Sequence, residues 1–239
     1  MLASVGRKWF YRCVQRIIVI TGTDTGVGKT LLTALLAAHL VRKGLKVTAL
    51  KPISSGNRED ARLLRRASNK VLPLDTINPW HFHAPIAPLL AARSERRTVR
   101  LRQVLAHIRS VAGSALRPDY ILVEGAGGLL SPLGAGFSTR ELIVGLGAEV
   151  VIVGANRLGV LNHLRLTVEA LPSSFVTKAK IVLMSPVRPD RASRGNIPLL
   201  KELVGGMPVT VLPRFIDPDD LDGVLTAAKV KAVLERLLS

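Results

Sequence analysis

Short apolar runs rich in valine, isoleucine and leucine recur along the chain, separated by longer stretches with a helical spacing of apolar residues. Continuous apolar runs of this length are typical of strands that are buried on both faces of a sheet. They predict strands at residues 17–21, 46–50, 120–123, 150–153, 180–184 and 209–212. The intervening stretches predict helices at residues 29–43, 59–66 and 101–115, another helix from about Val160, and helical segments beside the last two strands.

The alternation of strands and helices predicts an α/β fold with a mostly parallel central sheet and helices on both faces. In such sheets, ligands bind beyond the carboxyl ends of the strands. We therefore expect the residues at the predicted strand ends, Thr21, Lys51, Glu124 and Gly154, to lie along one edge. Residues 72–88 contain prolines and histidines, and they are predicted to form a loop over this edge.

The first predicted strand leads directly into a glycine-rich loop at residues 22–30, GTDTGVGKT, which is followed by a helix. This order of elements can wrap a phosphate chain, because loop N–H groups and the helix N-terminus both favour an anion. The loop is one residue longer than the usual G-x-x-x-x-G-K-[ST] pattern, since Gly22 lies six positions before Gly28. Lys29 is placed to reach the outer phosphates, and the Thr30 hydroxyl is placed to bind Mg²⁺. The loop predicts a nucleotide site of the P-loop NTPase type.

Three charged residues at or after other predicted strands could complete this site. Lys51 follows the second strand, Glu124 closes the third, and Asp60 lies at the start of a short helix. Nucleotide-bound Mg²⁺ prefers a hydroxyl and one or two carboxylates, so Thr30, Asp60 and Glu124 are candidate ligands. Glu59 is an alternative to Asp60, and structural roles as a solvated charge or a turn cap remain open for these side chains.

The helix that begins near Val160 is approached through Gly159, in the sequence LGVLNH. A helix N-terminus reached through a glycine can bind a carboxylate, because its N–H groups are exposed and its dipole favours negative charge. N-capping of the helix by Asn162 accounts for the same residues equally well.

The charge of the chain raises the question of nucleic-acid binding. There are 34 Lys and Arg against 17 Asp and Glu, which gives a formal net charge of +17. The basic residues are spread along the chain, and only 4% of residues are aromatic, so stacking platforms for bases are scarce. We expect an arginine-rich surface and no specific nucleic-acid partner.

The remaining composition favours a protein of a reducing cytoplasm. The one cysteine, Cys13, excludes an internal disulfide. No apolar run is long enough to cross a membrane, so no membrane association is expected. Residues 1–16 carry four basic residues and no acid, and they are predicted to form an N-terminal extension to a single domain at residues 17–239. The extension lacks the apolar core and the cleavage site of a secretory signal.

In combination, these motifs resemble the dethiobiotin synthetase family of P-loop NTPases. They occur in family order over about residues 17–215, and the lengthened phosphate loop is itself a trait of the family. The matching pieces are residues 22–30, KPISSG at residues 51–56, VEGAGG at residues 123–128 and LGVLNH at residues 158–163, with NPW at residues 78–80 and PIAP at residues 85–88.

The resemblance implies a homodimeric, Mg²⁺-dependent ligase that makes dethiobiotin from 7,8-diaminononanoate, CO₂ (or bicarbonate) and ATP. A carbamate on one amine attacks the ATP γ-phosphate, and the second amine then closes the ureido ring and expels phosphate. The implied catalytic residues are Lys29 and Lys51. The implied nucleotide contacts are Thr25, Gly26, Val27, Gly28, Lys29, Thr30, Leu31, Glu124, Gly127 and Ser185. The implied metal ligands are Thr30, Asp60 and Glu124. The implied substrate contacts are Thr25 and Ser55 and, across the dimer interface, Gly159, Val160, Leu161 and Asn162.

The chain departs from the family at two recognition positions. Ser185 and Pro186 stand where the family often reads adenine through an asparagine. Residues 191–199 contain no counterpart of a tyrosine that contacts the substrate from the partner chain in some members. The resemblance therefore predicts an intact catalytic set with altered recognition of the base and the substrate.

Two other functions occur on the same fold. Partitioning-type, nucleotide-switched ATPases that associate with DNA carry a signature lysine five positions before the loop lysine, where this chain has Asp24. Another ATP-dependent ligase, such as an amidotransferase, would need a glutaminase domain with a nucleophilic cysteine. Cys13 is misplaced for that role.

Overall fold

The computed structural model describes residues 15–186, 188–213 and 220–239. Residues 1–14, which make up most of the predicted N-terminal extension and include Cys13, lie outside the described residues. The first strand begins at Arg16, one residue before the predicted start of the domain. The Arg16 guanidinium donates to both carboxylate oxygens of Glu149 at 2.6 Å, which ties the start of this strand to the body of the protein.

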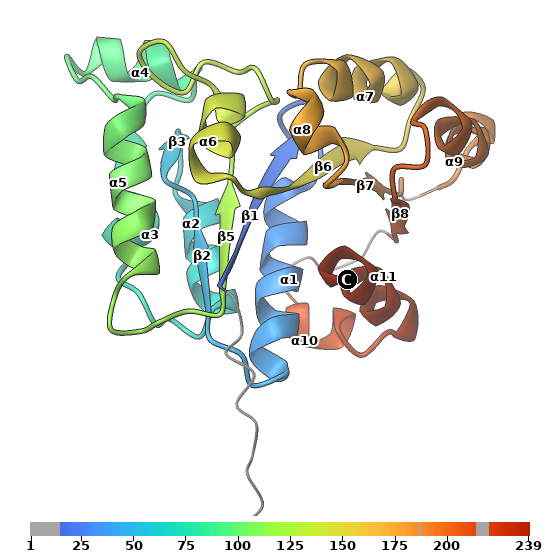
Figure 1. The fold of residues 1–239 in the computed structure, drawn as a ribbon, viewed down its shortest axis with the longest axis horizontal. Coiled ribbons are helices and arrows are strands. Elements are labelled where there is room, and N and C mark those ends of the chain that lie inside the picture. Colours follow the sequence, from blue (N-terminus) through green and yellow to red (C-terminus); the bar gives the residue numbers. More distant parts are fainter. Residues whose placement is uncertain (1–14, 187, 214–219) are drawn as a thin grey trace, which may run out of the picture.

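The described residues form a six-stranded sheet in the order β2-β5-β1-β6-β7-β8 (Figure 1), and every pair of neighbouring strands is parallel. Its strands are β1 (Arg16–Gly22), β2 (Val47–Leu50), β5 (Tyr120–Glu124), β6 (Glu149–Ala155), β7 (Ala179–Met184) and β8 (Val209–Leu212). Each predicted strand lies within two residues of an observed one. The structure thus confirms the predicted α/β fold with a parallel central sheet.

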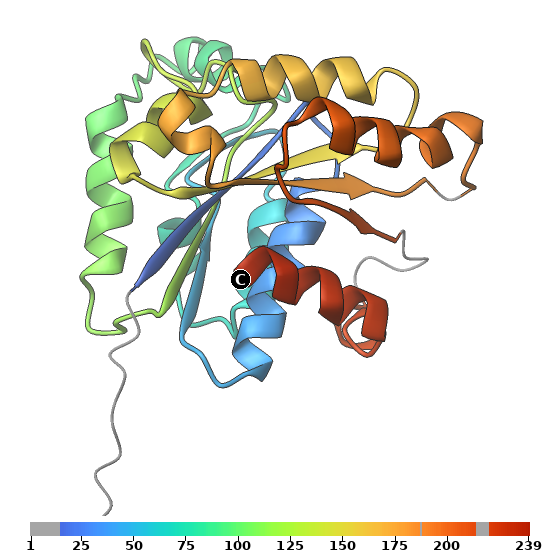
Figure 2. The same cartoon turned by 45° about the vertical axis from the view of Figure 1, so that its right-hand side comes forward.

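Helices cover both faces of the sheet, as Figure 2 shows. One layer contains α1 (Lys29–Arg42), α2 (Glu59–Ala67), α10 (Leu221–Val224) and α11 (Ala228–Leu238). The other contains α5 (Leu101–Ala112), α6 (Thr139–Leu146), α7 (Val160–Glu169) and α9 (Arg191–Leu203), with α3 (Leu74–Ile77), α4 (Pro88–Ser94) and α8 (Ser173–Val176) as shorter helices. None of the described helices is long and apolar enough to cross a membrane.

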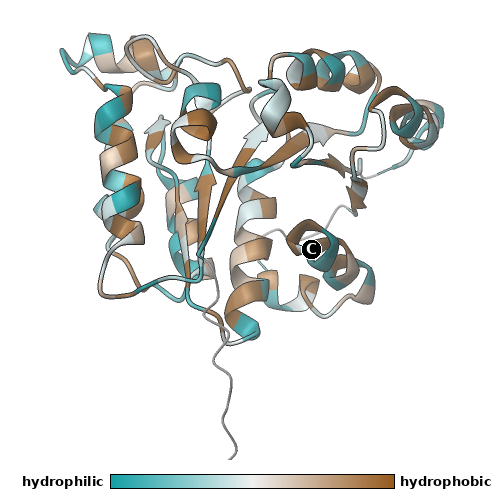
Figure 3. Ribbon diagram, in the orientation of Figure 1, coloured by the Kyte–Doolittle hydropathy of each residue, from teal (hydrophilic) through white to brown (hydrophobic). Residues whose placement is uncertain are grey.

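Two hydrophobic cores result, one on each face of the sheet. Successive side chains of a strand point to opposite faces, so Ile18 and Ile20 enter one core and Val19 enters the other. All three are at most 1% exposed. Hydropathy colouring accordingly shows apolar strands in the centre and helices of mixed character around them (Figure 3). A sheet buried on both faces holds its strand ends rigidly, which is what a site at that edge requires.

The segment at residues 72–88 differs from the single loop that was predicted. It contains α3 and also β4 (Trp80–Phe82), which pairs in parallel with β3 (Ile53–Ser55) just after β2. The prediction was wrong because each of these strands has only three residues, too few to show a period in the sequence. Fully buried Phe82 anchors the pair. Together β3 and β4 carry residues 85–88 to the carboxyl edge of the sheet, where they line a cavity.

Candidate active site

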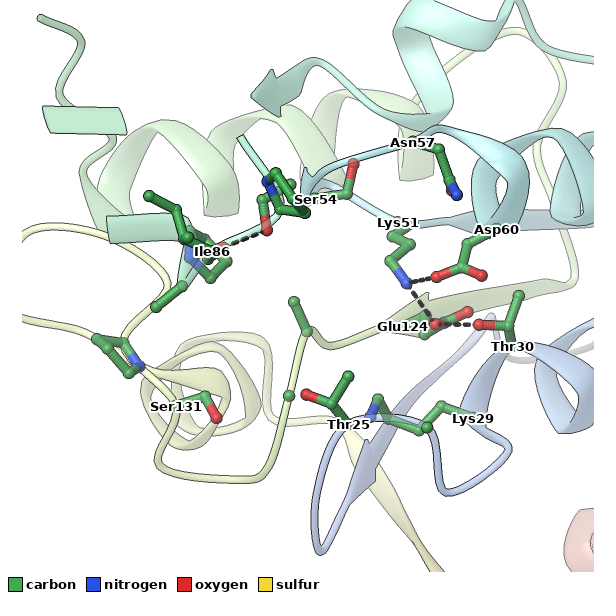
Figure 4. Close-up of a pocket in the computed structure, with 18 of the residues that line it drawn as sticks. Thr25, Lys29, Thr30, Lys51, Ser54, Asn57, Asp60, Ile86, Glu124 and Ser131 are labelled. Carbon is green, nitrogen blue, oxygen red and sulfur yellow. Dashed lines mark hydrogen bonds and ion pairs between the residues drawn. The ribbon is translucent and has the colours of Figure 1, made fainter. Parts of the chain in front are cut away.

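A cavity of about 730 Å³ opens at the carboxyl edge of the sheet (Figure 4), which is within the usual size range of ligand sites. Its walls come from the loop after β1, the segment after β2, the end of β5 and residues 85–88. The lining residues are Thr25, Gly26, Gly28, Lys29, Thr30, Lys51, Ser54, Ser55, Asn57, Asp60, Pro85, Ile86, Ala87, Pro88, Glu124, Ala126, Gly127, Ser131 and Pro132. Most of the predicted site residues therefore face one space.

The glycine loop wraps tightly around the start of α1. Gly26 and Gly28 have φ values of 72° and 100°, which glycine adopts without strain. A side chain at Gly28 would also lie 2.9 Å from the Met184 side chain. Lys29 is 6% exposed, and its Nζ donates to the carbonyl oxygen of Asp24 at 2.7 Å. Burial lowers the pKa of Lys29 to about 8, although nearby carboxylates oppose the shift.

We expect the Lys29→Met variant to be more stable than the wild type without nucleotide, although it should bind nucleotide poorly. Because burial lowers the pKa of Lys29 from 10.5 to about 8, holding its charge costs stability below pH 8, and this cost disappears as the pH rises toward 10.5. Thermal unfolding at pH 7 should favour the variant by about 1–3 kcal/mol, and the difference should shrink toward pH 10. A variant less stable than the wild type at pH 7 would contradict this account.

The register of the sheet brings the second lysine beside the buried acid. Leu50, the last residue of β2, pairs with Val123 of β5. Lys51 follows the end of β2, and Glu124 is the last residue of β5, so they lie side by side at the edge of the sheet. This is why two residues more than 70 positions apart in the sequence meet at one point.

The Lys51 ammonium joins two carboxylates. Its Nζ donates to Glu124 Oε1 at 2.8 Å, and it also forms an ion pair with Asp60 at the start of α2. Burial lowers the pKa of Lys51, but the charges of Glu124 and Asp60 outweigh burial and leave this pKa above its ordinary value. The two carboxylates therefore favour the charged form of this lysine.

The two carboxylate oxygens of Glu124 have different surroundings. Oε1 accepts hydrogen bonds from the Thr30 hydroxyl, at 2.7 Å, and from Lys51. Oε2 has no hydrogen-bond partner among the described residues, although Glu124 is only 1% exposed. Figure 4 shows these side chains pointing toward one another. A buried carboxylate oxygen without a partner is costly, which indicates that Oε2 is kept for a ligand.

Of the two acids considered at the start of α2, only Asp60 faces the cavity. Glu59 instead forms an exposed ion pair with Arg62 on the same helix. The structure therefore favours Asp60 over Glu59 as the acid that could meet a metal.

Several predicted contacts lie outside this cavity. Val27 and Leu31 pack into the core beneath the loop. Ser185 follows β7, and its N–H donates to the carbonyl of Leu212 at 2.9 Å. The residues at the start of α7 do not line the cavity either; they are Gly159, Val160, Leu161 and Asn162. Gly159 is the N-cap of α7, and no side chain among the described residues caps this helix, so the alternative of N-capping by Asn162 is not observed.

The structure also adds residues that the sequence did not single out. Ser131 lines the cavity, and its Oγ accepts the N–H of Gly128 at 2.8 Å. Asn57 lines the opposite wall, and its Oδ1 accepts the N–H of Glu59. Neither residue belongs to a recognisable pattern, because each reaches the cavity only through the conformation of its loop.

Comparison with known proteins relates the chain to a family. A sequence-family profile described as an AAA domain matches residues 16–217. The ATP-dependent dethiobiotin synthetase of Anaeromyxobacter dehalogenans is 44% identical over 173 residues, which cover 71% of this chain and 76% of the relative. The enzyme of the same name from Anaeromyxobacter sp. strain K is 40% identical over 207 residues, which cover 83% of this chain and 90% of the relative.

Solved structures show the same fold. The MinC:MinD cell division protein complex of Aquifex aeolicus matches 94% of this chain and 96% of that chain, with a TM-score of 0.62 and 18% identity. At this identity the likeness concerns the fold alone.

Proposed function

Because the chain belongs to the ATP-dependent dethiobiotin synthetase family of biotin biosynthesis, we propose that its cavity closes the ureido ring of dethiobiotin from 7,8-diaminononanoate and CO₂. The observation that carries this proposal is the meeting of Lys29, Thr30, Lys51 and Glu124 in one cavity. Two cations, a hydroxyl and a carboxylate are what a phosphoryl-transfer site needs around a triphosphate.

The glycine loop and Lys29 would hold the ATP phosphates. The backbone N–H groups of the loop and the N-terminus of α1 supply positive partial charge for the phosphate chain. The Lys29 ammonium now bonds the carbonyl of Asp24, and it would exchange this neutral acceptor for a phosphate oxygen. The anion would also favour the charged form of Lys29 and so remove the effect of burial on its pKa.

The donor set fits Mg²⁺. The free oxygen of Glu124, the Thr30 hydroxyl and the Asp60 carboxylate are the hard oxygen ligands that this ion prefers. No group of three His, Cys, Asp or Glu side chains among the described residues could hold a metal alone, so ATP oxygens and water would supply the other ligands. When bound, the ion would neutralise charge on the transferring phosphoryl group.

Lys51 would stabilise the carbamate and the transferring phosphoryl group. The carbamate oxygen attacks the γ-phosphorus, ADP leaves, and a carbamic–phosphoric anhydride forms. The second amine then attacks the carbonyl carbon, loses a proton and expels phosphate. Both steps develop negative charge on oxygen next to a buried ammonium, so Lys51 would stabilise them electrostatically. Thr25 and Ser55, which line the same cavity, would hold the diamine, and the Ser55 hydroxyl is oriented by its hydrogen bond to the carbonyl of Ile86.

A second copy of the chain would complete the substrate site. The start of α7 has free N–H groups that suit the carboxylate of the diamine, but it lies outside the cavity of its own chain. Leu158, just before this helix, is 83% exposed, and Leu166 on the helix is 57% exposed. Exposed leucines beside an anion-binding helix start support an interface here, in which each copy presents α7 to the cavity of the other.

Phosphate release by the purified protein tests the proposed reaction. We expect release from MgATP only when both 7,8-diaminononanoate and bicarbonate are present. Because Ser185 replaces the asparagine expected for adenine, other nucleoside triphosphates should support the reaction to a comparable extent. Release that does not depend on the diamine, or none with all substrates present, would count against the proposal.

A further inference from the structure

The backbone of Lys51 is held by two consecutive residues of another segment. The Lys51 N–H donates to the carbonyl of Ile77, the last residue of α3, at 3.0 Å. The Lys51 carbonyl accepts a hydrogen bond from Nδ2 of Asn78 at 2.7 Å. Ile77 and Asn78 together therefore hold both the N–H and the carbonyl of Lys51.

Asn78 is 1% exposed, and its amide is bonded on both sides. Its Oδ1 accepts hydrogen bonds from the Ser54 hydroxyl at 3.0 Å and from Arg58 Nε at 3.2 Å. Its Nδ2 donates to Lys51. Because two donors face the oxygen and one acceptor faces the nitrogen, only one orientation of the amide satisfies all three contacts.

Arg58 extends this network to the acid that pairs with Lys51. It is the N-cap residue of α2 and lies two residues before Asp60. Its guanidinium donates to the backbone carbonyl of Asn78 at 3.0 Å and forms an ion pair with Asp75 at 2.8 Å. The start of α2 and the segment of Lys51 are therefore tied to the same asparagine.

We propose that Asn78 is a positioning residue that sets where the Lys51 ammonium lies relative to Asp60, Glu124 and the reacting phosphoryl group. Asn78 does not line the cavity, so it acts through Lys51 and not by contact with substrate. The inference rests on the role proposed above for Lys51. It also explains why the fully buried Asn78 amide lies beside β3. This strand has only three residues, and its backbone hydrogen bonds are too few to fix the preceding Lys51.

The Asn78→Asp variant tests this inference with little change in shape. The carboxylate can still accept from Ser54 and Arg58, and the guanidinium keeps it ionised, but an oxygen now faces the Lys51 carbonyl. We expect kcat to fall about 30- to 100-fold, because misplacing a catalytic group by about 1 Å has an effect of this size. The KM for ATP should change by less than about twofold, since the phosphate loop lies on another segment.

A double-mutant cycle separates positioning from general damage. If Asn78 acts through Lys51, adding Asn78→Asp to a Lys51→Met protein should lower kcat no further. Losses that multiply would overturn the inference. Thr210→Ala is the control, because it removes a buried hydroxyl on the edge strand β8 that donates to the Ile181 carbonyl on β7. This control should leave kcat unchanged in either background.

A second measurement does not depend on activity. Limited acetylation, followed by peptide mass spectrometry, should modify Lys51 at least about fivefold faster in Asn78→Asp than in the wild type, while Lys29, buried in the same cavity, keeps its rate. Equal rates for Lys51 in both proteins would overturn the inference. If Lys51→Met proved fully active, the proposed role of Lys51 would fail, yet the acetylation rates would still show whether Asn78 holds this lysine.

Discussion

The Lys51→Met variant is expected to have a kcat about 10²–10³-fold below that of the wild type, which is the usual loss when one preorganised electrostatic contact to a transition state is removed. Methionine keeps most of the buried stem and removes the charge. The ammonium lines the same cavity as Lys29 and pairs with Glu124. A water molecule that took its place in the variant would be neutral and could not replace its charge. Steady-state phosphate release with both substrates saturating measures the effect.

The same variant should bind Mg²⁺ more tightly. Lys51 forms ion pairs with Glu124 and Asp60, so a metal ion that binds these carboxylates would compete with the lysine. Removing this cation should raise the metal affinity about tenfold, which is about 1.4 kcal/mol. Calorimetry without nucleotide, with Mn²⁺ as the probe in place of Mg²⁺, measures the change. By Coulomb's law, two unit charges about 4 Å apart interact by roughly 1 kcal/mol in bulk water and roughly 4 kcal/mol near a protein surface, and the expected gain lies within this range.

Lys43→Met is the matched control for Lys51→Met. Lys43 also pairs with a glutamate, Glu235, at 2.9 Å, but its side chain is 45% exposed. Exposed pairs of this kind contribute about 0–1 kcal/mol, so the control should leave kcat and metal affinity unchanged. Unchanged kcat in Lys51→Met, or a similar loss in both variants, would remove Lys51 from the mechanism.

The sequence could predict the parts of the site that follow from strand ends. Apolar runs located the strands to within two residues, and a parallel sheet then implied that Lys51 and Glu124 lie along the same edge. The glycine loop predicted Lys29 and Thr30 because its spacing is a local feature. Local pattern and sheet geometry agree at these positions, which is why the fold and the cations could be inferred together.

Other parts of the fold and the site could not be predicted, because they depend on very short strands or on individual hydrogen bonds. The pairing of β3 with β4 rests on three residues in each strand, and β4 lies in a segment that was predicted as a loop. The role of Asn78 becomes visible only when its hydrogen bonds are known. Likewise, the sequence names Glu124 as a candidate ligand, but only the structure shows that Oε1 accepts hydrogen bonds while Oε2 has no partner in the part of the chain that the structure describes.

The Glu124→Gln variant should lose metal binding and activity while keeping its fold. The amide oxygen of glutamine can still accept hydrogen bonds from Thr30 and Lys51, which now bond Oε1. The amide nitrogen would take the place of Oε2 and present N–H groups where a cation should bind. We expect Mn²⁺ affinity to fall at least about tenfold, as for other lost metal contacts, and kcat to fall about 10²–10³-fold.

Glu141→Gln is the matched control, because it removes a carboxylate that serves structure alone. Burial raises the pKa of Glu141, but hydrogen bonds from Ser138 and Arg140 outweigh it and lower this pKa to about 2. The charge therefore stabilises the fold above about pH 4.5, and this contribution is lost as the pH falls toward 2. At pH 7 the control should unfold slightly more easily, by about 0.5–1 kcal/mol, because glutamine still completes the capping box without the charge. Its kcat should match the wild type. If Glu124→Gln behaved like this control, with a small loss of stability and full activity, then the free oxygen of Glu124 would have no metal to bind, and the proposed phosphoryl-transfer site would lose its central carboxylate.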